Sequence, residues 1–382
     1  MLELRNVLKC RRLLAVLLAA CVEWNAAYAQ QRALTMGTTG RVDTRFVIAA
    51  PPFASDPSTD QYARGLSNVI ARDLDFSGLF KMVPVPEYPS RFRGFTSDVR
   101  SIKFNDWRET SAEYLIHAYV FERDGQLFAE CRLFDVLVAT QVVGKVLNVE
   151  PKAWRHLGHN FADEVVRHLT GVRGVGSTEI IFSAGRPGNK EIYVADYDGE
   201  NLTQITKHNS ISVSPQLSPD SSRIAYMSFK DRYPFLYILD RGAGRLTPFS
   251  KRVGLNHAPA WAPDGQALAL CLSKDGNTEI YTKRMDGANE RRITNDRSSD
   301  TSPTYAPNGR RIAFVSDRVG RPNIFAMDIN GGNIQRLSFQ GGNAYDPAWS
   351  PNGKSIAYVV EKSGDGLEIW VMNHDGGNAR RV

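Results

Sequence analysis

The chain has 382 residues, of which 42% are hydrophobic and 23% are charged. This composition is ordinary for a globular protein and excludes a disordered or fibrous one, and the length suggests two or three domains. No apolar stretch approaches the roughly 20 residues that a membrane-spanning helix needs, which excludes a polytopic membrane protein. The formal charge of +6 is mild, and without a concentrated basic patch it argues against nucleic-acid binding.

The first 29 residues are typical of an export signal. Four basic residues precede the apolar run 13–22, and Ala27-Tyr28-Ala29 forms an A-x-A site for a signal peptidase. We expect cleavage after Ala29. A second interpretation stays open, because Leu18-Ala19-Ala20-Cys21 has the spacing of a lipobox, which would make Cys21 a lipidated N-terminus.

Two cysteines remain after the signal, Cys131 and Cys271. They fall in different predicted domains, so two buried thiols are expected rather than a disulfide. No C-x-x-C motif occurs, and redox or zinc chemistry through cysteine is therefore unsupported.

Residues 30–172 predict a small α/β domain. A strand at 45–50 is followed by a helix with Ser58 or Asp60 as its N-cap, and Gly78 ends that helix before a strand at 79–83. Tyr114–Glu122 and Leu127–Val136 alternate around Asp124-Gly125, which predicts a β-hairpin. A second helix is expected from Pro151 to Gly171, and residues 173–177 form a Gly-rich linker.

An internal repeat dominates residues 178–382. Prolines at 219, 263, 307 and 351 are each separated by 44 residues, and a second proline precedes each of them by four positions. Apolar-aromatic pairs keep the same phase, from Ile192-Tyr193 to Ile369-Trp370. Within each unit, short β-prone runs alternate with Pro-Asp-Gly, Pro-Asn-Gly and Asp-Gly turns. Four short strands in every 44 residues predict the blades of a β-propeller.

The α/β segment carries motifs that resemble the TolB family. The matching stretches are Asp73–Phe80, Phe104–Arg108, Leu133–Val136, and Arg155–Asp163 running on to Gly171. The repeats and the order of signal, α/β domain and propeller resemble the same family.

The resemblance implies a periplasmic scaffold of the Tol-Pal system that is not an enzyme and needs no cofactor or metal. It implies binding of the lipoprotein Pal over one mouth of the propeller and of the periplasmic domain of TolA through the N-terminal region. Such a protein helps to maintain the outer membrane and its invagination in cell division. A monomer without a membrane span is expected.

One feature departs from the family. Its propeller has six blades, which at this period would need about 264 residues, whereas residues 178–382 number 205. About five repeat units are therefore visible, and the propeller is expected to be about one blade short at the C-terminus. Either the chain is shortened or its ring closes with fewer blades.

The Pal-facing mouth is expected at the loops that lead into the strands with the Pro-x-aromatic-x-Pro pattern. His257 is the best single contact expected there, and the alternative is a solvent-facing loop histidine. The positions that match the family's mouth are Leu255, Asn256, His257, Ala258, Thr301, Ser302, Tyr345 and Asp346.

The mature N-terminus is expected to be a mobile arm that engages TolA. It is polar and Gly/Thr-rich, and it could add as a strand to a partner's sheet; a frayed terminus is the alternative. Its candidate contacts are Gln30, Arg32, Leu34 and Thr35.

Metal sites are only weakly indicated. His156, His159 and Asp163 follow one another at helical spacing, but no clear further ligand accompanies them. Asp196-x-Asp198-Gly199 resembles the start of a calcium loop without the later acidic ligands, so a hairpin turn is expected there instead.

Propellers of this kind also occur in two other functional classes. Similar propellers precede serine peptidase domains, but no G-x-S-x-G nucleophile motif occurs, and no Walker A or dinucleotide fingerprint is present either. A propeller that binds carbohydrate or peptidoglycan stays open, because Tyr, Trp and Asn side chains at a mouth could stack on sugars.

Overall fold

A computed structural model describes residues 45–92, 94–185, 189–362 and 366–382. The expected signal peptide 1–29, lipidation of Cys21, and the arm residues Gln30, Arg32, Leu34 and Thr35 lie outside the described residues. Within these ranges, no helix has the length and hydropathy that crossing a bilayer requires.

The described chain packs as two compact units. One unit holds the described residues up to Glu179 together with the turn Asp196–Glu200. The other holds Ile180–Ala195 and Asn201–Val382. The linker expected at 173–177 stays a prediction. The two units divide after Glu179 in sequence, and the turn Asp196–Glu200 packs with the first unit although it lies within the sequence of the second.

The first unit is built on a mixed sheet with the strand order β3-β1-β4-β5-β6, and β2 also pairs with β4. The strands are β1 (Phe46–Ala49), β2 (Ala54–Ser55), β3 (Phe80–Met82), β4 (Tyr114–Arg123), β5 (Gln126–Asp135) and β6 (Thr140–Val149). Strand β1 pairs parallel with β3 and β4, while β4, β5 and β6 form an antiparallel meander. The predicted hairpin is confirmed, since Asp124 and Gly125 adopt φ of 52° and 73° in its two-residue turn.

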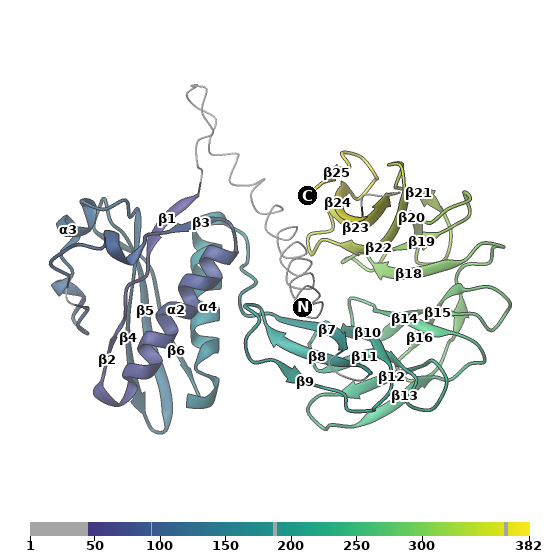
Figure 1. Cartoon of the computed structure of the whole chain (residues 1–382), viewed down its shortest axis with the longest axis horizontal. Coiled ribbons are helices and arrows are strands. Elements are labelled where there is room, and N and C mark those ends of the chain that lie inside the picture. The colour runs from purple at the N-terminus through teal and green to yellow at the C-terminus, as the bar shows by residue number, and fades with distance from the viewer. Residues whose placement is uncertain (1–44, 93, 186–188, 363–365) are drawn as a thin grey trace. The chain divides into compact units, whose positions relative to one another are not determined.

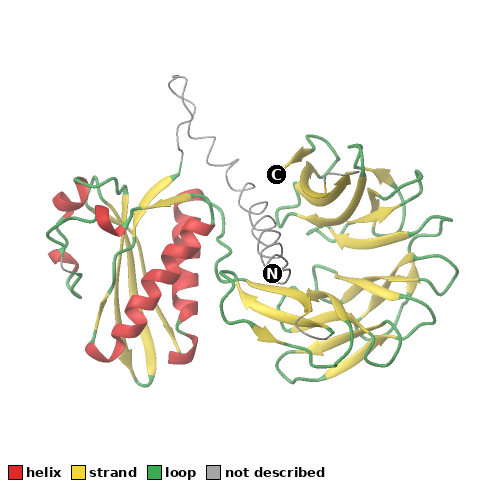
Figure 2. Cartoon of the chain, in the orientation of Figure 1, coloured by secondary structure: helices red, strands yellow, loops and turns green. Residues whose placement is uncertain are grey.

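Two helices pack side by side in this unit, α2 (Asp60–Phe76) and α4 (Arg155–Thr170), and a short helix α3 spans Phe104–Arg108. Figure 2 shows α2 and α4 as the two long red helices beside the sheet. Their apolar faces share one core with β4 and β5. Gly158 permits the close approach of the helices, because a Cβ there would lie 2.8 Å from Val69 Cγ1.

The helix ends differ slightly from the prediction. Thr59, rather than Ser58 or Asp60, is the N-cap residue of α2, and its side chain makes no capping hydrogen bond. Pro151 begins a turn of 3-10 helix, and α4 follows from Arg155. Gly171 ends α4 with φ of 74°, as expected for a left-handed C-terminal cap.

The second unit is a propeller of five sheets in the described residues (Figure 1). The first sheet has three strands, in the order β7-β8-β9, and the other four sheets have four strands each. The strands are β7 (Glu179–Gly185), β8 (Lys190–Asp196), β9 (Thr203–Gln204), β10 (Ser212–Leu217), β11 (Arg223–Ser228), β12 (Phe235–Asp240), β13 (Leu246–Ser250), β14 (Asn256–Trp261), β15 (Ala267–Leu272), β16 (Glu279–Arg284), β17 (Arg291–Arg292), β18 (Asp300–Tyr305), β19 (Arg311–Ser316), β20 (Asn323–Asp328), β21 (Gln335–Arg336), β22 (Asn343–Trp349), β23 (Ser355–Lys362), β24 (Gly366–Asn373) and β25 (Arg380–Arg381).

Each four-stranded sheet is an antiparallel meander that packs against the next sheet. The turns before the second strands contain Gly265, Gly309 and Gly353 at φ of 68°, 70° and 70°, a region that glycine adopts without the steric cost of a Cβ, and Ser221 takes the equivalent place at φ of 58°. The first strands β10, β14, β18 and β22 contact one another in succession. Apolar clusters fill the spaces between successive sheets, so each blade is stabilised mainly by its neighbours.

Candidate functional site

The expected mouth residues lie at the N-terminal ends of the first strands. Residues 256–258 belong to β14, Thr301 and Ser302 to β18, and Tyr345 and Asp346 to β22. Because these strands are neighbours and run in the same sense, their N-terminal ends lie at one end of the propeller. Ser302 Oγ donates a hydrogen bond to Asp346 Oδ1 at 3.0 Å, which brings two of the expected residues into contact across blades.

A β-bulge recurs at this position and was not predicted. In all four strands the pairing register shifts by one residue around the first of the paired prolines. The shift falls between the second residue before that proline and the residue after it. The residue before that proline adopts a left-handed conformation, with φ of 54° at Ser214, 49° at Ala258, 47° at Ser302 and 48° at Asp346. Bulges of this kind redirect side chains at sheet rims. The signal in the sequence was the 44-residue spacing of these four residues.

Leu255 and Asn256 have different roles in the structure. Leu255 is 43% exposed, and Val253, two positions before it in sequence, is 88% exposed. Asn256 is fully buried; its Oδ1 accepts from Ser250 Oγ and Arg252 N, and its Nδ2 donates to Arg252 O. Asn256 therefore closes the 250–256 loop and positions Leu255, rather than offering its own side chain to a partner.

His257 is a strand residue, so the alternative of a solvent-facing loop histidine is wrong. It pairs with Cys271 in register and is half-buried. Burial lowers the pKa of its imidazole, and His257 is therefore neutral at pH 7. Its Nε2 is buried without a hydrogen-bond partner among the described residues. A neutral ring of this kind can anchor the desolvated centre of an interface.

A second periodic feature, outside the predicted site, surrounds an aromatic residue in each of the four four-stranded sheets. A cation lies over a ring at the same position of four repeats: Lys230 on Tyr237, Lys274 on Tyr281, Arg318 on Phe325 and Lys362 on Trp370. The cations are again 44 residues apart in sequence. In two blades an aspartate also accepts from the tyrosine hydroxyl, Asp231 from Tyr237 and Asp275 from Tyr281. These contacts stabilise the turns between strands.

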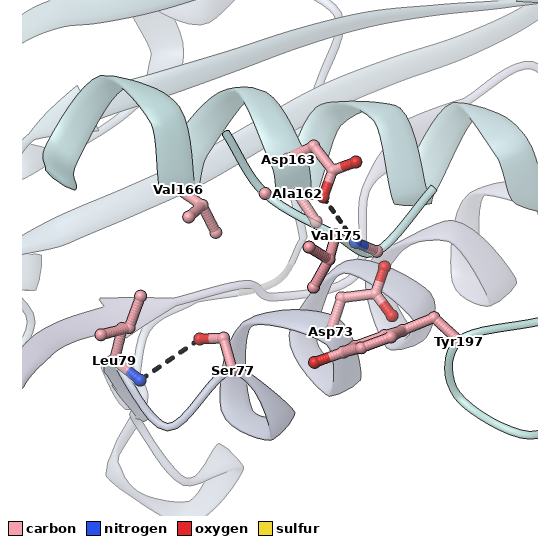
Figure 3. Close-up of a pocket in the computed structure, with 10 residues that line it drawn as sticks. Asp73, Ser77, Leu79, Ala162, Asp163, Val166, Val175 and Tyr197 are labelled. Carbon is pink, nitrogen blue, oxygen red and sulfur yellow. Dashed lines mark hydrogen bonds between the residues drawn. The ribbon is translucent and has the colours of Figure 1, made fainter. Parts of the chain in front are cut away.

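The helical metal motif does not assemble. His156 is exposed, whereas His159 is buried. Asp163 accepts from the backbone N–H groups of Gly176 and Ser177 at 2.6 and 3.0 Å, so its oxygens are used in holding the segment after α4. Figure 3 shows Asp163 and Asp73 at a small pocket between α2, α4 and this segment, with Ser77 and Tyr197 also at its wall.

Carboxylates from the turn Asp196–Glu200 approach α4 in the same unit. Side-chain atoms of His159, Asp196 and Asp198 lie within 4.8 Å of one another. Arg155 already binds both acids, with Nε 3.1 Å from Asp196 Oδ2 and Nη2 2.5 Å from Asp198 Oδ2. The guanidinium supplies the positive charge that a metal ion would bring, so the arrangement is an ion-pair network.

Both cysteines of the described residues are free and buried, as predicted. Complete burial raises the pKa of the Cys131 thiol to about 12 and also raises that of Cys271. Neither group is a nucleophile at neutral pH.

The two units match two family models in the same order along the chain. Residues 34–142 match the TolB amino-terminal domain, and residues 166–382 match the TolB beta propeller domain. The chain belongs to the TolB family.

Curated and solved TolB proteins agree with this assignment. The Tol-Pal system protein TolB of Dinoroseobacter shibae is 35% identical over 190 residues, covering 48% of this chain and 42% of that protein. That of Bordetella parapertussis is 35% identical over 222 residues, covering 58% and 48%. The crystal structure of TolB from Acinetobacter baumannii aligns with a TM-score of 0.78 and 28% identity, covering 89% of this chain and 83% of that one.

These alignments span about half the length of the curated relatives. The TolB propeller match contains all of the expected mouth residues, and the TolB amino-terminal match contains α2 and the sheet through β5. Helix α4 lies across the start of the propeller match, in the TolB-like stretch noted in the sequence.

Proposed function

We propose that this chain is a periplasmic adaptor of the Tol-Pal system, in which the propeller mouth binds Pal and the N-terminal region binds TolA. The support is the pairing of both TolB domains in one chain and the name of its curated relatives, Tol-Pal system protein TolB. Its role is binding rather than catalysis, and it contributes to outer-membrane integrity and invagination during cell division.

The recurrent bulge is the observation that best supports a binding mouth on the propeller. It places His257, Thr301 and Tyr345 next to the left-handed residues Ala258, Ser302 and Asp346, at one end of adjacent strands. Small, polar and aromatic groups thus alternate around a rim that also carries exposed Leu255. A mixed rim with a neutral histidine and apolar anchors is suited to a protein partner.

Calorimetric titration of residues 30–382 with the Pal domain of the same organism tests this proposal. We expect saturable one-to-one binding that His257→Ala or Thr301→Ala weakens by roughly 5-fold or more, because truncation of a central contact costs at least about 1 kcal/mol. A variant lacking residues 30–42 is expected to retain the Pal site and to lose binding to the TolA periplasmic domain.

Matched substitutions away from the mouth separate contact loss from misfolding. His374 is an exposed histidine in the turn after β24, and Thr203 is an exposed threonine on β9. Their alanine variants should bind Pal like the parent protein. Absence of Pal binding by a chain that still melts cooperatively would overturn the proposal, and binding of soluble peptidoglycan fragments in that case would support the carbohydrate-binding alternative.

A further inference from the structure

His159 on α4 lies among carboxylates from two other segments of its unit. It is 1% exposed, and its Nδ1 donates to Asp73 Oδ2 of α2 at 2.6 Å. Its Nε2 lies 3.6 Å from Asp196 Oδ2 in the turn Asp196–Glu200. The imidazole of His159 thus lies between two carboxylates. Asp73 belongs to α2, and Asp196 belongs to a turn that is distant in sequence.

The carboxylates around His159 outnumber the cations, and a proton on the ring offsets one of the negative charges. Arg155 pairs with Asp196 and Asp198, and Arg72 lies 3.3 Å from Glu200 but 3.9 Å from Asp198. Asp73 is 4% exposed, and in the described part of the chain its ion-pair partner is His159. A neutral imidazole would leave this buried carboxylate without a compensating cation, which is costly.

Other charged groups packed around α4 do not supply that cation. Lys145 of β6 pairs with Glu164 at 3.6 Å, and Arg132 of β5 pairs with Glu130 at 2.8 Å. Asp163, one turn after His159, adds negative charge and is bonded to the segment at Gly176.

Backbone hydrogen bonds from Asp196 N to Glu200 O and from Gly199 N to Asp196 O, both 2.9 Å, shape the turn, and side-chain contacts near His159 join it to the helices. Tyr197 is buried, and its ring packs edge-on against Phe76 at the end of α2, with the centroids 5.2 Å apart. Asp196 and Asp198 bind Arg155 of α4, as described above. Asp196 is at once an anchor of the turn and the acid that faces His159 Nε2.

We propose that His159 is a proton-dependent latch that holds the turn Asp196–Glu200 on helices α2 and α4. In its charged form the imidazolium lies between Asp73 and Asp196 and offsets one of the negative charges of the cluster. When the proton leaves, both carboxylates face a neutral ring, and the turn separates more readily from the helices.

The protonation energetics have the sign that this latch requires. Burial lowers the pKa of His159, but the hydrogen bond and charge of Asp73 and the charges of Asp198 and Asp196 outweigh it, so the net pKa is raised. Burial raises the pKa of Asp73, an effect that His159 only partly offsets. The folded state therefore holds the shared proton more tightly than the unfolded chain. The stabilisation is complete below the unfolded histidine pKa of about 6.5 and is lost as pH rises through the folded value.

Hydrogen exchange of residues 30–382 at several pH values, corrected for intrinsic exchange rates, tests the latch. Protection of amides in residues 196–200 is expected to fall as pH rises above about 6.5, by at most tenfold per pH unit for one proton. His159→Asn keeps a donor for Asp73 but cannot titrate, so its protection should be lower near pH 6 and nearly independent of pH. His156→Asn, on the exposed face of the same helix, should behave like the parent protein.

A second measurement keeps the test decisive if His159→Asn fails to fold. Histidine side-chain NMR of the parent protein should give His159 a pKa above the ordinary value, and Asp73→Asn should lower it. A His159 pKa at or below about 6.5, or protection of the turn that does not change with pH, would overturn the latch.

Discussion

At the residue scale, burial decides what the chemically active side chains can do. Cys131, Cys271 and His257 belong to residue types that often react or bind metals, yet each is packed within a sheet. Desolvation favours the neutral form of all three, raising the pKa of the thiols and lowering that of the imidazole. The two buried thiols therefore contribute packing rather than reactivity, and the half-buried His257 is a neutral group.

The thiols give a direct check on this packing. In residues 30–382, Cys131 and Cys271 should not react with a thiol reagent such as DTNB at pH 8, because both are fully buried and the pKa of Cys131 is about 12. Both should react in concentrated guanidinium chloride. Stoichiometric labelling of the native protein would contradict the described cores of both units.

At the element scale, the bulges show how one local irregularity is repeated around the propeller. An L-residue in the left-handed region is strained by roughly 1–2 kcal/mol, and this conformation recurs at Ser214, Ala258, Ser302 and Asp346. Three of the four belong to residue types with short side chains, and the fourth is Asp, which tolerates this region better than most residues. The strain is retained because strand pairing on both sides of the bulge fixes the backbone.

Ser302→Val tests the strain at one bulge. A β-branched residue is disfavoured at φ of 47°, and the change also removes the bond to Asp346, so the free energy of unfolding should fall by about 1–3 kcal/mol. Thr304→Val, on the same strand but outside the left-handed positions, is the control and should change stability by less. Equal effects of the two substitutions in denaturant titrations would argue against a strained bulge.

At the scale of the whole molecule, the chain contains two cores of different construction. Helices α2 and α4 and strands β4 and β5 share one cluster that includes Leu66. The propeller has a series of smaller clusters between sheets, and Ile312 lies in one of them. The first unit packs both helices into one large cluster with its sheet and has a second cluster around Trp107, whereas the propeller repeats one pattern of packing.

Large-to-small substitutions should therefore affect the two units separately. Leu66→Ala and Ile312→Ala each remove a side chain that is fully buried, at a cost of roughly 2–5 kcal/mol. Calorimetry should resolve two transitions, with Leu66→Ala lowering one and Ile312→Ala the other. A single transition that both variants shift equally would show that the two cores unfold as one.

The propeller, the hairpin at Asp124-Gly125 and the two long helices followed from the sequence alone. Each is encoded by short-range order: the 44-residue period, alternating apolar residues, and glycines at turns and helix ends. The TolB resemblance likewise depended on contiguous motifs, which is why family and fold could be predicted together.

Only the tertiary structure decided which side chains meet. Asp73 and His159 are 86 residues apart. Asp196, which the sequence predicts to be part of a propeller blade, lies beside His159 in the structure. The bulges also depend on pairing with a neighbouring strand, so local propensity does not indicate them. Contacts of this kind arise from packing between distant segments. Burial of a charged or polar group without a partner costs free energy, so such groups pair with whichever residues the fold brings close.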